Sequence, residues 1–304
     1  ITANGSAAGA QGGTIVIRNN GNGAVAGATT IAANVTATGN AANGGSITLE
    51  STGANAGAVT VSSGTVSANA VGASGNGGAV TIRGLTFTGS GGAQTFSANG
   101  ATTGTGNGGT VSLATTGATA DITFAAGGFA LAATGGATAG NGGTVSATAG
   151  RSLTVNATSL TAGALAGNGN GGTINLTGSN TVATGTLTIS AALSANGSLV
   201  GNGGTINVIN NSTGALTLNT AGTLTASAGG TSGQGGVILI RDLNAAGTVS
   251  LQSALTANNR GAFAGGSITV DSLGAVSLNY AAAGAWTAHN VGTTGNGGTI
   301  SVPG

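Results

Sequence analysis

The stretch "GNGGTINV" at 201–208 decides the fold, because closely related stretches recur along the whole chain. They read "GNGGAVTI" (75–82), "GNGGTVSL" (106–113), "GNGGTVSA" (140–147) and "GNGGTISV" (295–302). The Gly-Gly pair of this motif returns with a period of about 32 residues over all 304 residues. Repetition at a fixed period indicates an array of stacked structural units rather than one catalytic loop.

Each repeat contains three short alternating patterns that predict β-strands. After the Gly-Gly pair, apolar and polar residues alternate, as at Ile206 and Val208. A period of two is typical of a strand with one buried face. A second alternation follows, for example "TLTIS" (186–190), and a third places a large residue before Ala, as at Leu193 and Ala195. Gly and Asn fill the corners, where a positive φ is tolerated.

Stacking of these repeats predicts an all-β fold. No repeat has a helical pattern, and three short strands cannot bury their apolar face alone, so neighbouring repeats must stack. We expect a three-sided parallel β-solenoid, or β-helix, with about 32 residues per coil and nine to ten coils, forming one array over 1–304. The sequence begins and ends in mid-coil without a capping pattern, so we expect an excerpt of a longer chain or a protomer that stacks on others.

The corner motif carries an amide side chain at the same place in nearly every repeat. Like side chains of successive coils should lie above one another, so we expect them to form a hydrogen-bonded amide ladder along the axis. Its members are Gln11, Asn43, Asn76, Asn107, Asn141, Asn170, Asn202, Gln234 and Asn296, and Ala264 interrupts the series.

Charged residues are scarce, and five of them occupy the same position in their repeats. The chain has five Arg, no Lys and four acidic residues, with a net charge of +1. Arg18, Glu50 and Arg83 each follow the second corner Gly by five residues, and Arg241 and Asp271 repeat this arrangement. We expect two stretches of alternating sign, forming a charge ladder that fixes strand register, because like charges directly opposite one another destabilise a sheet.

Several classes of function fit this composition poorly. The Arg residues lie far apart, which argues against nucleic acid as a partner, and no apolar run is long enough for a transmembrane helix. His289 is the single His, Cys is absent, and the acids do not occupy matching positions in adjacent coils. We therefore expect no catalytic residue, no cofactor and no metal site, and "GNGG" also lacks the Lys-Ser/Thr of a phosphate-binding loop.

The outward positions of the first strand suggest two kinds of contact. Half of the repeats place a hydroxyl at both positions, as at Thr144 and Ser146, so a binding module that presents a Thr/Ser/Asn ladder to ice or to a polysaccharide is the alternative function. Ile209, Val237 and Leu239 form an apolar cluster on the same face, which can mark a lateral contact between fibres or subunits.

The stretches "ALSANGSLVGNGGTINV" (192–208) and "TLTASAGGTSGQGGVILI" (223–240) resemble the repeats of filamentous-haemagglutinin-like bacterial exoproteins of the two-partner-secretion type. This resemblance implies a parallel β-helix, export through an outer-membrane partner, and a role in adhesion, aggregation or extracellular fibres. The amino-terminal secretion domain of that family is not among these residues.

From the repeats and this resemblance we expect an extracellular or cell-surface protein of a bacterium, a stiff rod or fibre in a surface or biofilm-matrix filament. We expect it to self-associate end to end or laterally, or to bind a glycan or cell-surface ligand.

Overall fold

A computed structural model gives the structure of the chain. It describes all residues of 1–304 except 22–26, 54–55, 90–92, 125–127, 158, 179–183, 220–221, 279–284, 293 and 303–304. The described residues contain strands and turns, and no helix among them could span a membrane.

The first strands of the repeats form a ten-stranded sheet, called here the first sheet. Its strands, in order, are β1 (Thr14–Asn20), β5 (Ser46–Thr52), β9 (Ala79–Gly84), β12 (Thr110–Thr115), β15 (Thr144–Ala149), β18 (Thr173–Gly178), β21 (Thr205–Asn210), β24 (Val237–Asp242), β27 (Ser267–Ser272) and β30 (Thr299–Ser301).

The second strands form the nine-stranded second sheet. It consists of β2 (Gly27–Ile31), β6 (Ala56–Val61), β10 (Phe87–Gly89), β13 (Ile122–Phe124), β16 (Leu153–Val155), β19 (Leu187–Ile189), β22 (Leu216–Leu218), β25 (Thr248–Leu251) and β28 (Ala275–Leu278).

The third strands form the nine-stranded third sheet. It consists of β3 (Val35–Thr36), β7 (Gly64–Ser67), β11 (Gln94–Ser97), β14 (Phe129–Ala132), β17 (Ser159–Thr161), β20 (Ala192–Ser194), β23 (Thr223–Thr225), β26 (Ala254–Thr256) and β29 (Trp286–Thr287). A two-stranded sheet of β4 (Gly39–Asn40) and β8 (Ala70–Val71) lies in the corner loops of two coils and was not foreseen from the sequence.

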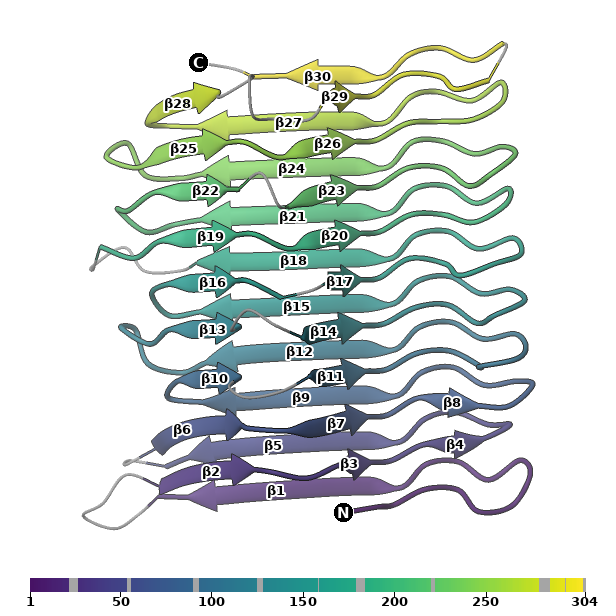
Figure 1. Cartoon of the computed structure of the whole chain (residues 1–304), viewed down its shortest axis with the longest axis vertical. Helices are drawn as coiled ribbons and strands as arrows, with labels where there is room; N and C mark the ends of the chain where they lie inside the picture. The colour runs from purple at the N-terminus through teal and green to yellow at the C-terminus, as the bar shows by residue number, and fades with distance from the viewer. Residues whose placement is uncertain are drawn as a thin grey trace.

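The coils stack along one axis, as Figure 1 shows. Strands of the first sheet run in one direction, and the second and third strands of each coil run back behind them, nearly in line. Each strand of the three main sheets pairs in parallel with the like strand of the next coil, as β21 does with β24, where Ile206 faces Ile238. The predicted three-sided parallel β-solenoid is therefore confirmed.

The inward residues of all three sheets meet in one continuous apolar core. In a central coil, Ile174, Leu176, Leu187, Ile189 and Leu193 are each 0% exposed. After its large inward residue, the third strand is followed by a small one, Ala, which is also buried, as Ala195 is after Leu193. The sequence periodicity thus maps directly on to burial, because side chains of a strand alternate between the two faces of its sheet.

Four phenylalanines gather in the core of the coils that contain β10 and β13. The ring centroids of Phe124 and Phe129 are 4.8 Å apart, and Phe87 contacts Phe96 edge to face at 6.1 Å. Gly89 takes an inward position at which the neighbouring coils carry Val61 and Phe124, and a Cβ on Gly89 would collide with the Phe129 ring. The missing side chain therefore makes room for the extra aromatic ring.

The corner glycines are required because backbones of adjacent strands and coils nearly touch there. A Cβ on Gly171 would lie well inside van der Waals contact with the Ala195 carbonyl oxygen of the next coil. A Cβ on Gly172 would do the same with the Gly143 carbonyl oxygen of the preceding coil. The Gly-Gly pair is thus the point at which no side chain fits, which explains its return in every repeat.

We expect Gly171→Ala to lower the free energy of unfolding by about 2–3 kcal/mol, because the added methyl group has to displace backbone in the neighbouring coil. Urea unfolding followed by circular dichroism measures the loss. The matched control is Gly230→Ala, an exposed corner position where an added Cβ meets nothing within 4 Å. Equal destabilisation by the two substitutions would contradict the steric explanation.

Candidate functional site

The corner asparagines join one coil to the next through a pair of hydrogen bonds. The backbone N–H of Asn170 donates to Oδ1 of Asn141 at 2.9 Å, and the N–H of Gly142 donates to the carbonyl oxygen of Asn170 at 2.8 Å. The Asn141–Gly142 dipeptide therefore binds both the backbone N–H and the backbone carbonyl oxygen of Asn170 in the next coil. We call this arrangement the Asn-Gly clamp.

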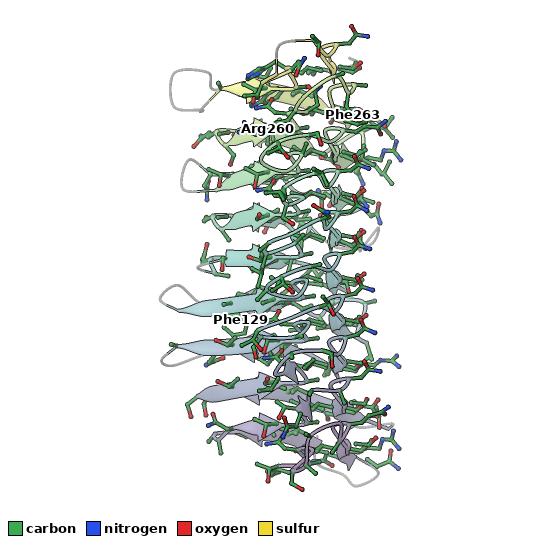
Figure 2. The ribbon with its side chains drawn as sticks, turned by 90° about the vertical axis from the view of Figure 1, so that its right-hand side faces the viewer. Phe129, Arg260 and Phe263 are labelled. Atoms are coloured by element: carbon green, nitrogen blue, oxygen red, sulfur yellow. The ribbon has the colours of Figure 1, made fainter. Side chains whose placement is uncertain are left out.

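The clamp repeats without interruption over six successive steps. The bonds to Oδ1 measure 2.8–2.9 Å, and they link Asn43, Asn76, Asn107, Asn141, Asn170, Asn202 and Gln234 in that order. The corner loops of successive coils, which carry these amides, are stacked and face the viewer in Figure 2. The hydrogen bonds run from backbone to side chain, whereas the sequence had suggested bonds from one side-chain amide to the next.

Three members of the expected ladder take part only through their backbone. After Gln11, the N–H of Gly12 donates to the Asn43 carbonyl oxygen at 3.1 Å. Gly235, which follows Gln234, donates to Ala264 in the same way, and the Asn296 carbonyl accepts from Gly265 at 3.0 Å. Ala264 has no amide to offer, so the side-chain half of the clamp is missing at that coil.

A second column of side-chain acceptors follows the third strand and was missed from the sequence. Oδ1 atoms accept backbone N–H groups of the next coil at 2.7–3.0 Å, and the pairs are Asn4 with Thr38, Asn69 with Asn99, Asn99 with Thr134, Asn196 with Ser227 and Asn258 with His289. Thr and Ser replace Asn in several coils, so no single residue type marked this column. Its signal was the polar residue directly after the inward Ala of the third strand.

His289 lies in this second column, where its backbone N–H donates to Oδ1 of Asn258 at 3.0 Å. Its neighbour Trp286 is partly buried against the core, with Nε1 donating to the Ser253 carbonyl oxygen at 3.2 Å. In the structure, Trp286 therefore has a packing role and His289 a backbone role.

The charge ladder forms ion pairs at two of its three expected steps. Nε of Arg18 lies 2.7 Å from Oε2 of Glu50, and Nε of Arg241 lies 2.9 Å from Oδ2 of Asp271. Glu50 and Arg83 are in register, yet no ion pair of the described residues includes Arg83. The intervening coils place uncharged residues in this column, and Ile209 stands directly below Arg241.

A third ion pair, between Arg151 and Asp121, was missed because the two residues are offset by one position. Nε of Arg151 donates to Oδ1 of Asp121 at 2.9 Å, and Nη2 lies 2.5 Å from Oδ2. The Ser152 N–H also donates to Oδ1 of Asp121 at 2.9 Å. Hydrogen bonding to Arg151 lowers the pKa of the Asp121 carboxyl below its ordinary value, and burial opposes this only in part.

Asp242 is the one acid buried inside the described part of the fold, at 1% exposure. Oδ1 accepts the Asn244 N–H at 3.2 Å, while Oδ2 has no hydrogen-bond partner. Burial therefore raises the pKa of the Asp242 carboxyl. Asn210 occupies the same position one coil earlier, and its Nδ2 donates to the Gly214 carbonyl oxygen at 2.9 Å.

The outer face of the second sheet carries a regular row of hydroxyl side chains. One outward position holds a hydroxyl in all nine strands, and the members in order are Thr30, Thr60, Thr88, Thr123, Thr154, Thr188, Thr217, Ser250 and Ser277. We call it the threonine column. None of the nine strands contains a charged residue. The sequence analysis had looked for such a row only on the first strand.

The first sheet has a less regular outer face. Thr144 and Thr173 are in register, as are Ser146 and Asn175, whereas Val237 and Leu239 replace hydroxyls in β24. Val237 is 42% exposed, and Leu239 and Ile209 are half-buried. These three residues do lie on the outer face, as expected for a lateral contact.

The described coils offer no pocket, and no three His, Asp or Glu side chains lie close enough together in them to hold a metal ion. The arrangement can present repeated hydrogen-bonding groups on its surface. Compared with protein-family models, with curated proteins and with solved structures, the chain gives no match.

We expect Asn141→Ala to lower the free energy of unfolding by about 1 kcal/mol, since the Asn170 N–H loses its acceptor. Asn168→Ala is the matched control in the same corner, because Asn168 is exposed and forms no hydrogen bond among the described residues. We expect its effect to stay within about 0.5 kcal/mol. Urea unfolding at neutral pH compares the two, and equal losses would show that the clamp contributes nothing.

We expect Asp242→Asn to raise the free energy of unfolding at neutral pH by about 1 kcal/mol, because it removes a buried, half-paired carboxylate. The pKa of the Asp242 carboxyl is higher in the folded than in the unfolded state. Its contribution to the free energy of unfolding is therefore most favourable at acid pH, and it falls as pH rises through the folded pKa. The gain should therefore shrink on acidification, which urea midpoints across a pH series would show. Asn210→Asp, the reverse change one coil earlier, should lose stability at neutral pH.

Proposed function

We propose that this chain is a rod-forming segment of an extracellular or cell-surface bacterial protein, with a structural or adhesive role in a fibre. The observation that carries the proposal is the continuity of coil-to-coil hydrogen bonding. Three parallel sheets and the clamped corners link successive coils, while the described residues enclose no pocket. Such a molecule is expected to resist bending and stretching. Its function would then depend on its length and on contacts made by its outer faces.

The distribution of polar groups supports this role. Backbone N–H and carbonyl groups of successive coils are paired in the sheets and again in the corner loops. Few of the described backbone groups therefore depend on water as a hydrogen-bond partner. Charged residues make up only 3% of the chain, and three of the five Arg form ion pairs between coils. The rod therefore depends little on ionic strength, which suits a protein outside the cell.

The resemblance to filamentous-haemagglutinin-like exoproteins supports secretion and adhesion. The repeats at 192–208 and 223–240 carry that resemblance, and the solenoid agrees with the fold it implies. A lateral contact between rods would use the outer face of β24, where Val237 and Leu239 interrupt the hydroxyl rows. End-to-end association of coils would extend the rod by the same parallel pairing that joins β21 to β24.

Limited trypsin digestion tests the rod directly. Trypsin cleaves a locally opened chain, and opening a central coil breaks all three sheets. We expect the folded protein to stay intact at Arg151 and Arg241 under conditions that rapidly digest the urea-unfolded chain. Rapid cleavage at either site in the folded protein would contradict a continuous rod. Cryo-electron microscopy of the native material should then show rods with an axial repeat of about 4.8 Å.

A second candidate function rests on the threonine column. Nine hydroxyls at one-coil spacing on an uncharged sheet form a periodic surface that could order water, as in binding to ice, or match a neutral polysaccharide. Thermal hysteresis and binding to insoluble neutral glycans measure the two activities. Thr123→Lys, Thr154→Lys and Thr188→Lys together should abolish either one. The control carries Thr144→Lys, Thr173→Lys and Thr205→Lys on the first sheet, and equal effects of the two triple variants would contradict a role for the column.

A further inference from the structure

The corner clamps have a chemical consequence, because Asn-Gly is the dipeptide most prone to deamidation. In that reaction the backbone nitrogen of the Gly attacks Cγ of the preceding Asn and loses its proton, and the side-chain nitrogen leaves as ammonia. Water then opens the cyclic imide to give Asp or its β-linked isomer. The attack requires the Gly nitrogen and the Asn carboxamide to rotate toward each other, so a structure that holds both groups elsewhere prevents it.

The clamp holds both reacting groups. At Asn170–Gly171, Oδ1 accepts the Asn202 N–H at 2.9 Å and the Gly171 N–H donates to the Asn202 carbonyl oxygen at 2.9 Å. The same pair of bonds is present in the second column, where Asn196–Gly197 holds Ser227 at 2.8 and 2.9 Å. The clamped carboxamide is directed to the next coil, and the Gly nitrogen already has an acceptor.

Asn168–Gly169 is an Asn-Gly pair that lies outside the clamp, two residues before Asn170. Asn168 is exposed, and no hydrogen bond among the described residues involves its side chain. The Gly169 N–H has only a long contact of 3.4 Å to Oγ of Ser198. The Gly169 carbonyl oxygen accepts the Ser198 N–H at 2.8 Å, so the Asn168 side chain is the part of this pair without a bond. The corner stretch "NGNGG" (168–172) thus places one unclamped and one clamped Asn-Gly pair side by side in a single coil.

We propose that Asn168 is a site of spontaneous deamidation in the folded protein, and that the Asn-Gly clamp suppresses the same reaction at Asn170 and the other clamped pairs. Only water is consumed and ammonia is released, so no enzyme or oxidant is required. Each event replaces a neutral amide by a carboxylate and takes the net charge of the chain from +1 toward 0.

The experiment uses the intact chain incubated at mildly alkaline pH and 37 °C, with samples taken over weeks. Unfolding, digestion with thermolysin and tandem mass spectrometry then locate the acid residues in the peptides that cover 165–175. We expect Asn168 to deamidate about tenfold or more faster than Asn170 in the folded protein, because reaction at a clamped pair has to wait for local opening. Isoelectric focusing should show the matching gain of one negative charge.

The same incubation in concentrated urea is the control, because both pairs then lack tertiary contacts. We expect Asn168 and Asn170 to react at similar rates there. Ser198→Ala, which removes the one acceptor of the Gly169 N–H, should accelerate deamidation of Asn168 and leave Asn170 unchanged. Asn168→Gln should remove the fast-forming acid from the peptides that cover 165–175. Equal rates at Asn168 and Asn170 in the folded protein would overturn the proposal, and so would an Asn168 that reacts only in urea.

Discussion

Close approach of backbone to backbone at the corner is the constraint on which the rest of this structure depends. At Gly171 and Gly172 the chain passes the carbonyl oxygens of both neighbouring coils at a distance that no side chain tolerates. This contact sets where each coil turns into the first sheet, and all ten strands of that sheet start from it. The clamp uses the proximity, because an Asn side chain can reach the coil above only where the two backbones are already near.

The clamp also explains why Asn precedes the Gly-Gly pair so consistently. An Oδ1 atom at this position accepts a backbone N–H that lies in a loop and would otherwise depend on water. Each bond is worth about 1 kcal/mol, and the free energy accumulates over the six successive steps that repeat it. Gln234 and Ala264 show the limit of the design, since backbone bonding continues there while the side-chain half is lost.

The surface and the core of the rod follow different rules. Large inward positions of the core hold apolar residues of different sizes. Gly89 leaves space at its position, and the ring of Phe129 from another strand fills that space. The outer faces vary more, except in the threonine column, where one residue type persists over seven coils. Persistence at an outward, exposed or half-buried position is the feature that makes this column a candidate binding surface. The clamped corners, in contrast, are regular for a reason internal to the fold.

The sequence by itself determined the period, the three strands of each coil, the inward residues and the parallel stacking. These follow from local alternation and from the need of each repeat to bury its apolar face against the next, both of which are visible along one chain. It also placed the corner amides in one column and paired Arg18 with Glu50 and Arg241 with Asp271, since residues one period apart meet in a solenoid.

Only the tertiary structure decided which atoms meet. The amide hydrogen bonds run from backbone to side chain, and Arg151 pairs with Asp121 although the two residues are offset by one position. The Asn168 side chain makes no bond although Asn170, two residues later in the same loop, is clamped. These details depend on how each loop residue lies relative to the adjacent coil. The burial of Asp242 likewise depends on where the corner after β24 closes. Periodicity specifies which residues stack, whereas the exact path of the backbone between strands fixes hydrogen bonding, and that path is set by contacts with the coils on either side.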